Sequence, residues 1–103
     1  MATGSQDAEV FGGIEPVAEE DQAVTILREL TLQMARAVVT HPDQVRVEAI
    51  AGASIIVLDL SVDPEDMGRV IGKEGRVATA MRTLLRTSAA KMGQRVTLEI
   101  IET

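Results

Sequence analysis

The stretch GRVIGKEGRVATAMR, residues 68–82, contains two glycines that enclose a lysine and a glutamate, Gly72-Lys73-Glu74-Gly75. Glycine has no Cβ atom, so such a pair lets the backbone turn tightly or approach another molecule closely. A helix that begins at Arg76 would direct its free N–H groups and the positive end of its dipole at this turn. Arg69 adds a further positive charge. The turn is therefore suited to binding phosphate groups, with a simple helix–helix corner as the alternative.

A nucleoside triphosphate site does not fit this stretch. The Walker A loop needs four residues between its first glycine and its Gly-Lys pair. Here three residues separate Gly68 from Gly72, and Glu74 stands where the magnesium-binding Ser or Thr is needed. The G-x-G-x-x-G pattern of dinucleotide sites is also absent from the sequence.

The residues that could support catalysis are few. The single histidine, His41, precedes a proline at an expected helix end, where an exposed or capping role is predicted. Asp63, Glu65 and Asp66 are grouped, but acids in the first turn of a helix are typically capping residues. No spacing of metal ligands occurs, and cysteine is absent. We expect no enzymatic activity, no metal and no cofactor.

The charge of the chain is divided between two regions. The formal net charge is −6, and residues 1–21 hold six acids and no Lys or Arg. Residues 67–95 hold seven Lys or Arg against Glu74 alone. The chain is acidic because of its N-terminal segment and basic around the glycines, so its net charge does not exclude a nucleic-acid partner.

The N-terminal residues 1–21 show no apolar periodicity and are predicted to form a disordered acidic tail before a single domain at 22–103. No apolar run is long enough to cross a membrane, and the start of the chain lacks the features of a secretory signal. A cytoplasmic location is expected.

Apolar periodicity predicts the order α-β-β-α-α-β for the domain. The predicted segments are a helix from Gln22 to the HPD at 41–43, strands at 45–50 and 55–62, a short helix at 64–71, a longer helix from Arg76 to Gly93, and a strand at 95–102. The first two strands form a hairpin, and the two linking helices make the last strand parallel to the second. The expected fold is of the α+β class, an α/β sandwich whose three-stranded mixed sheet has helices on one face.

Residues 61–101 resemble the core of a KH domain, with the I-G-x-x-G signature at Ile71–Gly75. The predicted element order is similar to the type II, bacterial arrangement, and the size is similar to small single-KH bacterial RNA-binding proteins. The resemblance covers roughly residues 24–102. It implies a fold of this type and a non-catalytic protein that holds single-stranded RNA, about four nucleotides per domain.

The resemblance also implies the residues and partners of the site. The turn would clamp the RNA backbone, apolar residues would line the groove, and the last strand near Leu98 and Ile100 would form its far wall. The RNA-binding residues that the resemblance implies, or that positive charge suggests, are Arg69, Val70, Ile71, Gly72, Lys73, Glu74, Gly75, Arg76 and Val77. Such proteins act as homodimers or with a second KH-containing protein, and are linked to post-transcriptional regulation or RNA chaperoning in cell growth and division.

A second hypothesis is a protein-interaction or dimerisation module with a vestigial RNA groove. The helix from Gln22 has an apolar surface broader than one stripe, and Ile55, Val57 and Ile101 are expected on an exposed sheet face. The two hypotheses are compatible, because a dimer could present two grooves.

Overall fold

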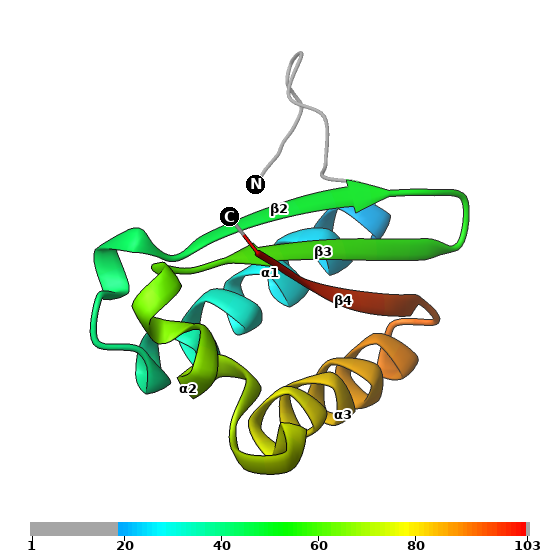
Figure 1. The fold of residues 1–103 in the computed structure, drawn as a ribbon. Helices are drawn as coiled ribbons and strands as arrows, with labels where there is room; N and C mark the ends of the chain where they lie inside the picture. The colour runs from blue at the N-terminus through cyan, green and yellow to red at the C-terminus, as the bar shows by residue number, and fades with distance from the viewer. Residues whose placement is uncertain (1–18, 103) are drawn as a thin grey trace.

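The computed structural model describes residues 19–102 of the chain, and the side chains of residues 22–102 (Figure 1). Three α-helices, three 3₁₀ turns and three strands follow one another along it. In chain order they are α1 (Glu19–Val38), η1 (Pro42–Gln44), β2 (Arg46–Ala51), β3 (Ile55–Ser61), η2 (Pro64–Asp66), α2 (Met67–Ile71), η3 (Lys73–Gly75), α3 (Arg76–Lys91) and β4 (Arg95–Ile101).

The sheet has the strand order β2-β3-β4. Strands β2 and β3 form an antiparallel hairpin in which Ala49 pairs with Leu58. Strand β4 returns parallel to β3, and Leu58 pairs with Leu98. Because β3 is central, β4 is an edge strand whose outer side has no neighbouring strand in the described part of the chain.

One face of this sheet carries the hydrophobic core. Along β3 the side chains alternate, with Ile56, Leu58 and Leu60 buried and their neighbours half-buried. Helices α1 and α3 cover the buried face, as the ribbon in Figure 1 shows. Leu27 of α1 and Leu85 of α3 have no exposed surface and join the same core. Packing of one helical stripe from each helix against the sheet therefore holds the layers together.

The predicted α-β-β-α-α-β order and mixed sheet with helices on one face are confirmed. Helix α1 begins at Glu19, three residues before the predicted start at Gln22. The short helix predicted at 64–71 consists of a 3₁₀ turn followed by the five residues of α2. Residues 1–18 lie outside the described residues, so the predicted acidic tail stays a prediction.

Within the described residues, none of the helices has both the length and the apolar character that a membrane crossing requires.

Candidate nucleic-acid interface

The turn between α2 and α3 has a backbone that few residues other than glycine adopt. Gly72 has φ 78° and ψ 169°, and Gly75 has φ 75° and ψ 13°. Between them Glu74 also lies in the left-handed region, with φ 58° and ψ 26°. Three positive φ values within four residues reverse the chain, so that α3 starts directly after the turn.

The two glycines are needed for different reasons. A Cβ atom on Gly72 would lie 2.5 Å from Cγ2 of Val77 and 2.8 Å from its backbone nitrogen, so Gly72 lets the turn pack against α3. A Cβ on Gly75 would meet no atom within 4 Å. The free side of Gly75 instead faces a groove. Gly72 therefore serves the packing of the turn, and Gly75 keeps its outer side open.

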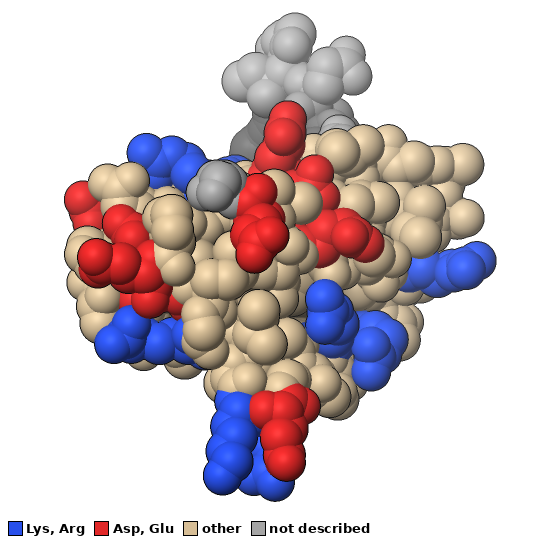
Figure 2. All heavy atoms as spheres, in the orientation of Figure 1, with Lys and Arg blue, Asp and Glu red and all other residues tan. Residues whose placement is uncertain are grey.

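The charged side chains of the turn are exposed. Arg76 Nη2 lies 3.2 Å from Glu74 Oε1, and both side chains are well exposed, so this ion pair contributes little to stability. Lys73 forms no ion pair among the described residues, and no side chain caps the first N–H groups of α3. In Figure 2, positive and negative side chains project together from the lower end of the molecule, where this turn lies in Figure 1.

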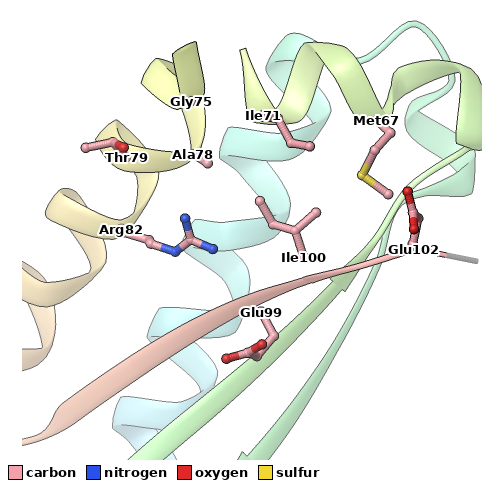
Figure 3. A pocket seen from close by; sticks show the side chains of 9 residues that line it. All are labelled: Met67, Ile71, Gly75, Ala78, Thr79, Arg82, Glu99, Ile100 and Glu102. Atoms are coloured by element: carbon pink, nitrogen blue, oxygen red, sulfur yellow. The ribbon is translucent and has the colours of Figure 1, made fainter. Parts of the chain in front are cut away.

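A groove of about 380 Å³ opens beside the turn, between α2, α3 and the edge strand β4. Figure 3 shows Ile71 and Ile100 facing each other across it, with α3 on one side. Its nine lining residues are Met67, Ile71, Gly75, Ala78, Thr79, Arg82, Glu99, Ile100 and Glu102. The groove therefore has an apolar floor, an open glycine at one end and charged side chains along its strand side.

The strand side of the groove combines positive and negative groups. The guanidinium of Arg82 donates from Nε and from Nη2 to the backbone carbonyl of Leu98, at 3.3 and 3.2 Å. Glu99 of β4 and Glu102, which follows the end of β4, line the same groove. Figure 2 shows acidic side chains gathered on the sheet side, above positive ones on the helix side. Negative charge at β4 disfavours phosphate there and favours it near the turn.

The structure places the predicted site residues in three groups. Ile71 and Gly75 line the groove, and Gly72, Lys73, Glu74 and Arg76 lie in or next to the turn. The prediction that Val70 lines the groove is wrong, because its side chain has no exposed surface. Val77 does not line this groove either: it lies on the opposite side of α3, in an apolar hollow that α3 forms with α1.

Arg69 is held away from the groove. Its Nη1 lies 3.2 Å from Oδ1 of Asp66 and donates to the backbone carbonyl of Glu65. Of the far wall expected at Leu98 and Ile100, only Ile100 presents its side chain, because the side chain of Leu98 is buried.

Asp66 is buried and joins α2 to the end of α1. The predicted capping role is confirmed for Asp63, whose carboxylate accepts the N–H of Glu65, but wrong for Asp66. Asp66 accepts hydrogen bonds from the N–H and hydroxyl of Thr40 and from the N–H and ring Nδ1 of His41. We call this set of contacts the Asp66 clasp. It fixes the orientation of α2, and so of the turn that follows it.

The clasp changes the acidity of both partners. Burial alone would raise the pKa of Asp66, but the hydrogen bonds from Thr40 and His41 outweigh it and hold that pKa well below its usual range. The hydrogen bond to Asp66 raises the pKa of His41 above its ordinary value, with the acids around it adding to the effect. His41 Nε2 also lies 3.9 Å from Glu65 Oε1.

Sequence reasoning missed most of the α3 side of the groove. Ala78, Thr79 and Arg82 follow Gly75 at steps of three, four and seven, which places all four on one helix face. This spacing could have identified Arg82 from the sequence, because a residue seven positions from a clamp glycine lies two turns along the same face.

Comparisons with known proteins give a family match and several relatives. The family model described as "KhpA/KhpB, KH domain" matches residues 28–100. The chain is 51% identical over 73 residues to the RNA-binding protein KhpA of Caldanaerobacter subterraneus subsp. tengcongensis, covering 71% of this chain and 97% of that protein. It is 45% identical over 75 residues to the RNA-binding protein KhpA of Clostridium acetobutylicum, covering 73% of this chain and all of that protein.

A solved structure shares the fold. The Era protein of Aquifex aeolicus, in a crystal structure with GDP and AlF4−, superposes with a TM-score of 0.60 at 17% identity. The match covers 95% of this chain and 36% of the Era chain, and at this identity it shows the fold alone. The family match and the KhpA relatives carry the assignment, and the family is non-enzymatic. The chain belongs to the KhpA/KhpB KH-domain family.

Proposed function

We propose that this protein binds single-stranded RNA without catalysis, with the sugar–phosphate backbone against the turn Gly72–Gly75 and the bases in the groove. The observation that carries the proposal is the open side of Gly75 at the uncapped start of α3, next to a groove of about 380 Å³. KH domains clamp about four nucleotides with such a loop. The relatives in the family are named RNA-binding proteins, which supports the same function.

The charges support one orientation of the strand. Lys73 and Arg76 stand at the turn, and Glu99 and Glu102 stand across the groove at β4. Phosphates are attracted to the first pair and repelled by the second, so the backbone lies along the turn and the bases point toward β4. With Ile71 and Ile100 as floor, bases are held by apolar contact rather than by aromatic stacking.

The test is fluorescence anisotropy with short random single-stranded RNA over a salt series. Three or four phosphate contacts predict a slope of log K against log salt of roughly −2 to −3. The variant Lys73→Asp/Glu74→Asp reverses the charge of the turn, while Asp tolerates the left-handed backbone at position 74. Loss of binding with an unchanged melting temperature supports the clamp. Unchanged binding in the folded variant would overturn it.

A second function, association with another copy of the chain, is favoured by a separate observation. An apolar hollow of about 450 Å³ lies between α1 and α3, lined by Met34, Val38, Val77 and Leu84 among others. Leu84 is 47% exposed and Val38 36%. A homodimer, or a heterodimer with a second KH-containing protein, would cover these side chains and bring two grooves together, raising avidity for RNA.

Sedimentation of the wild type and of Leu84→Asp at several concentrations tests this second function. A dimer in the wild type and a folded monomer in the variant support it. A wild type that stays monomeric at all concentrations would exclude the homodimer. It would leave only the heterodimer, which is tested by adding the partner. For the cellular role we propose a cytoplasmic post-transcriptional regulator or RNA chaperone linked to growth and division.

A further inference from the structure

Arg82 is the positive side chain that lies inside the groove rather than at its turn. It follows Gly75, Ala78 and Thr79 on one face of α3, and its guanidinium points from α3 toward β4 in Figure 3. Nε and Nη2 both donate to the carbonyl of Leu98, at 3.3 and 3.2 Å. Because β4 is an edge strand, this carbonyl would otherwise be free to accept a hydrogen bond from a bound base.

The contact with Leu98 fixes the guanidinium and leaves part of it unused. An arginine has five N–H donors in a planar fork. With one from Nε and one from Nη2 directed at Leu98, both N–H groups of Nη1 and the second of Nη2 remain. These form the end of the fork, the side that makes two parallel hydrogen bonds to a pair of acceptors. The backbone contact therefore holds this end ready for a ligand.

Arg82 thus changes what the groove wall offers to a base. The edge carbonyl that would accept the amino group of adenine or cytosine is occupied, and donors face the groove instead. Guanine presents two adjacent acceptors, O6 and N7, which arginine contacts with both arms of its fork. Adenine places an amino group at the position of O6, where it would meet the N–H donors of Arg82.

The opposite wall does not add a second contact to the base. Glu99 lines the groove, but in Figure 3 its side chain leaves β4 on the side away from Arg82 and Ile100, so its carboxylate does not face the guanidinium. The discrimination therefore depends on Arg82. Uracil has no adjacent pair of acceptors, because an N–H separates its carbonyls, and adenine carries its amino group beside both N1 and N7. Cytosine presents adjacent O2 and N3 acceptors, so Arg82 should separate guanine from adenine and uracil rather than from cytosine.

We propose that Arg82, fixed by the carbonyl of Leu98, makes this groove prefer guanine to adenine at one position of the bound RNA. The inference rests on the proposed RNA binding and deepens it, because it assigns the base that the groove prefers and a residue that specifies it.

The experiment uses the full chain and uridine hexamers whose two central bases are guanine, adenine, inosine or 2-aminopurine. We expect the wild type to bind the guanine hexamer about tenfold more tightly than the adenine one, near the lower part of the range for two-armed arginine–guanine contacts. 2-Aminopurine, which lacks O6, should bind like adenine. Inosine, which lacks the N2 amino group but keeps O6 and N7, should bind like guanine.

Two variants of Arg82 and one control assign the preference. Arg82→Met keeps the long side chain without donors, and Arg82→Lys keeps the charge without the fork. Both should reduce the guanine preference to about twofold or less, and Arg82→Lys should leave the salt dependence unchanged. Arg86→Met is the matched control, because Arg86 lies one turn further along α3, donates to Thr83 and does not line this groove. It should keep the full preference.

Each result decides something different. Equal binding of the guanine and adenine hexamers by the wild type would overturn the inference while leaving RNA binding intact. A preference that persists in both folded Arg82 variants would overturn the role of Arg82. Absence of binding to every hexamer at low salt would overturn the proposed function and this inference with it. Circular dichroism of each variant identifies those that fold, and Arg82→Lys serves if Arg82→Met does not.

Discussion

The ring Nδ1 of His41 lies 3.1 Å from Oδ2 of Asp66, a carboxylate without exposed surface 25 positions further along the chain. The same carboxylate contacts Arg69 on α2. The connection that leaves α1 is therefore bonded to the helix that carries the Gly72–Gly75 turn. The orientation of the proposed clamp depends on this pair of residues.

Removing the carboxylate should lower stability and loosen the turn. In Asp66→Ala the N–H groups of Thr40 and His41 lose their acceptor in a partly buried place, which is costly. We expect a clearly lower melting temperature and weaker RNA binding in the fraction that folds. The control is Asp63→Ala, which removes only one cap and should cost about 1 kcal/mol. Equal melting temperatures for the two variants would contradict the central role of Asp66.

The His41–Asp66 pair should make stability depend on pH. The pKa of His41 is raised in the folded chain, so its contribution is complete below the ordinary value of 6.5 and is lost as pH rises through the folded-state pKa. The pKa of Asp66 is lowered, so its contribution is present above 3.8 and is lost as pH falls toward the folded-state pKa. Both contributions to stability are therefore complete between pH 3.8 and pH 6.5.

Urea unfolding of the wild type and His41→Gln, at about pH 5.5 and about pH 8.5, measures the histidine part. The wild type should exceed the variant in free energy of unfolding by more at the lower pH than at the higher. A difference that grows with pH would show that His41 is stabilising only when neutral.

The two clamp glycines should respond differently to the same substitution. Gly72→Ala would place a Cβ within 2.8 Å of backbone in α3 at a positive φ, so we expect a loss of stability of about 3 kcal/mol or more. Gly75→Ala meets no neighbouring atom and should cost about 1 kcal/mol for its left-handed backbone. Its methyl group should nonetheless weaken RNA binding, because it fills the open side of the turn. Thermal melts and anisotropy of both variants provide the comparison.

Glu74 should be replaceable with a gain in both stability and affinity. It adopts φ 58°, which asparagine tolerates better than glutamate. Its exposed pair with Arg76 contributes little, so Glu74→Asn should raise stability by about 0.5–1 kcal/mol. Loss of a negative charge beside the phosphates should also strengthen RNA binding at low salt, and less so at high salt. Glu48→Gln, at an exposed position of β2 that neither lines the groove nor forms an ion pair among the described residues, controls for net charge alone.

The sequence predicted the helices and strands better than the side-chain contacts between them. Alternation along 55–62 and the helical period from Arg76 each reflect burial on one face, which a local pattern records. Helix α2 has only five residues, too few for a period to show which side faces the core, so Val70 and Ile71 were given the same role. The partners of Asp66 lie 25 and 26 positions earlier, a distance that capping rules, which are local, do not consider.

The adjacent residues Val70 and Ile71 provide the last prediction, because they separate stability from RNA binding at one point of the chain. Val70 has no exposed surface, and Val70→Ala removes two buried carbon groups, so we expect a loss of about 1.5–3 kcal/mol. Ile71 is 41% exposed and lines the groove, so Ile71→Ala should cost stability only about 0.5–1 kcal/mol. RNA affinity should show the reverse order, falling severalfold in Ile71→Ala and little in folded Val70→Ala, because only Ile71 offers surface to a base. If Val70→Ala weakened RNA binding as much as Ile71→Ala while fully folded, the floor of the groove would include residues that this structure buries.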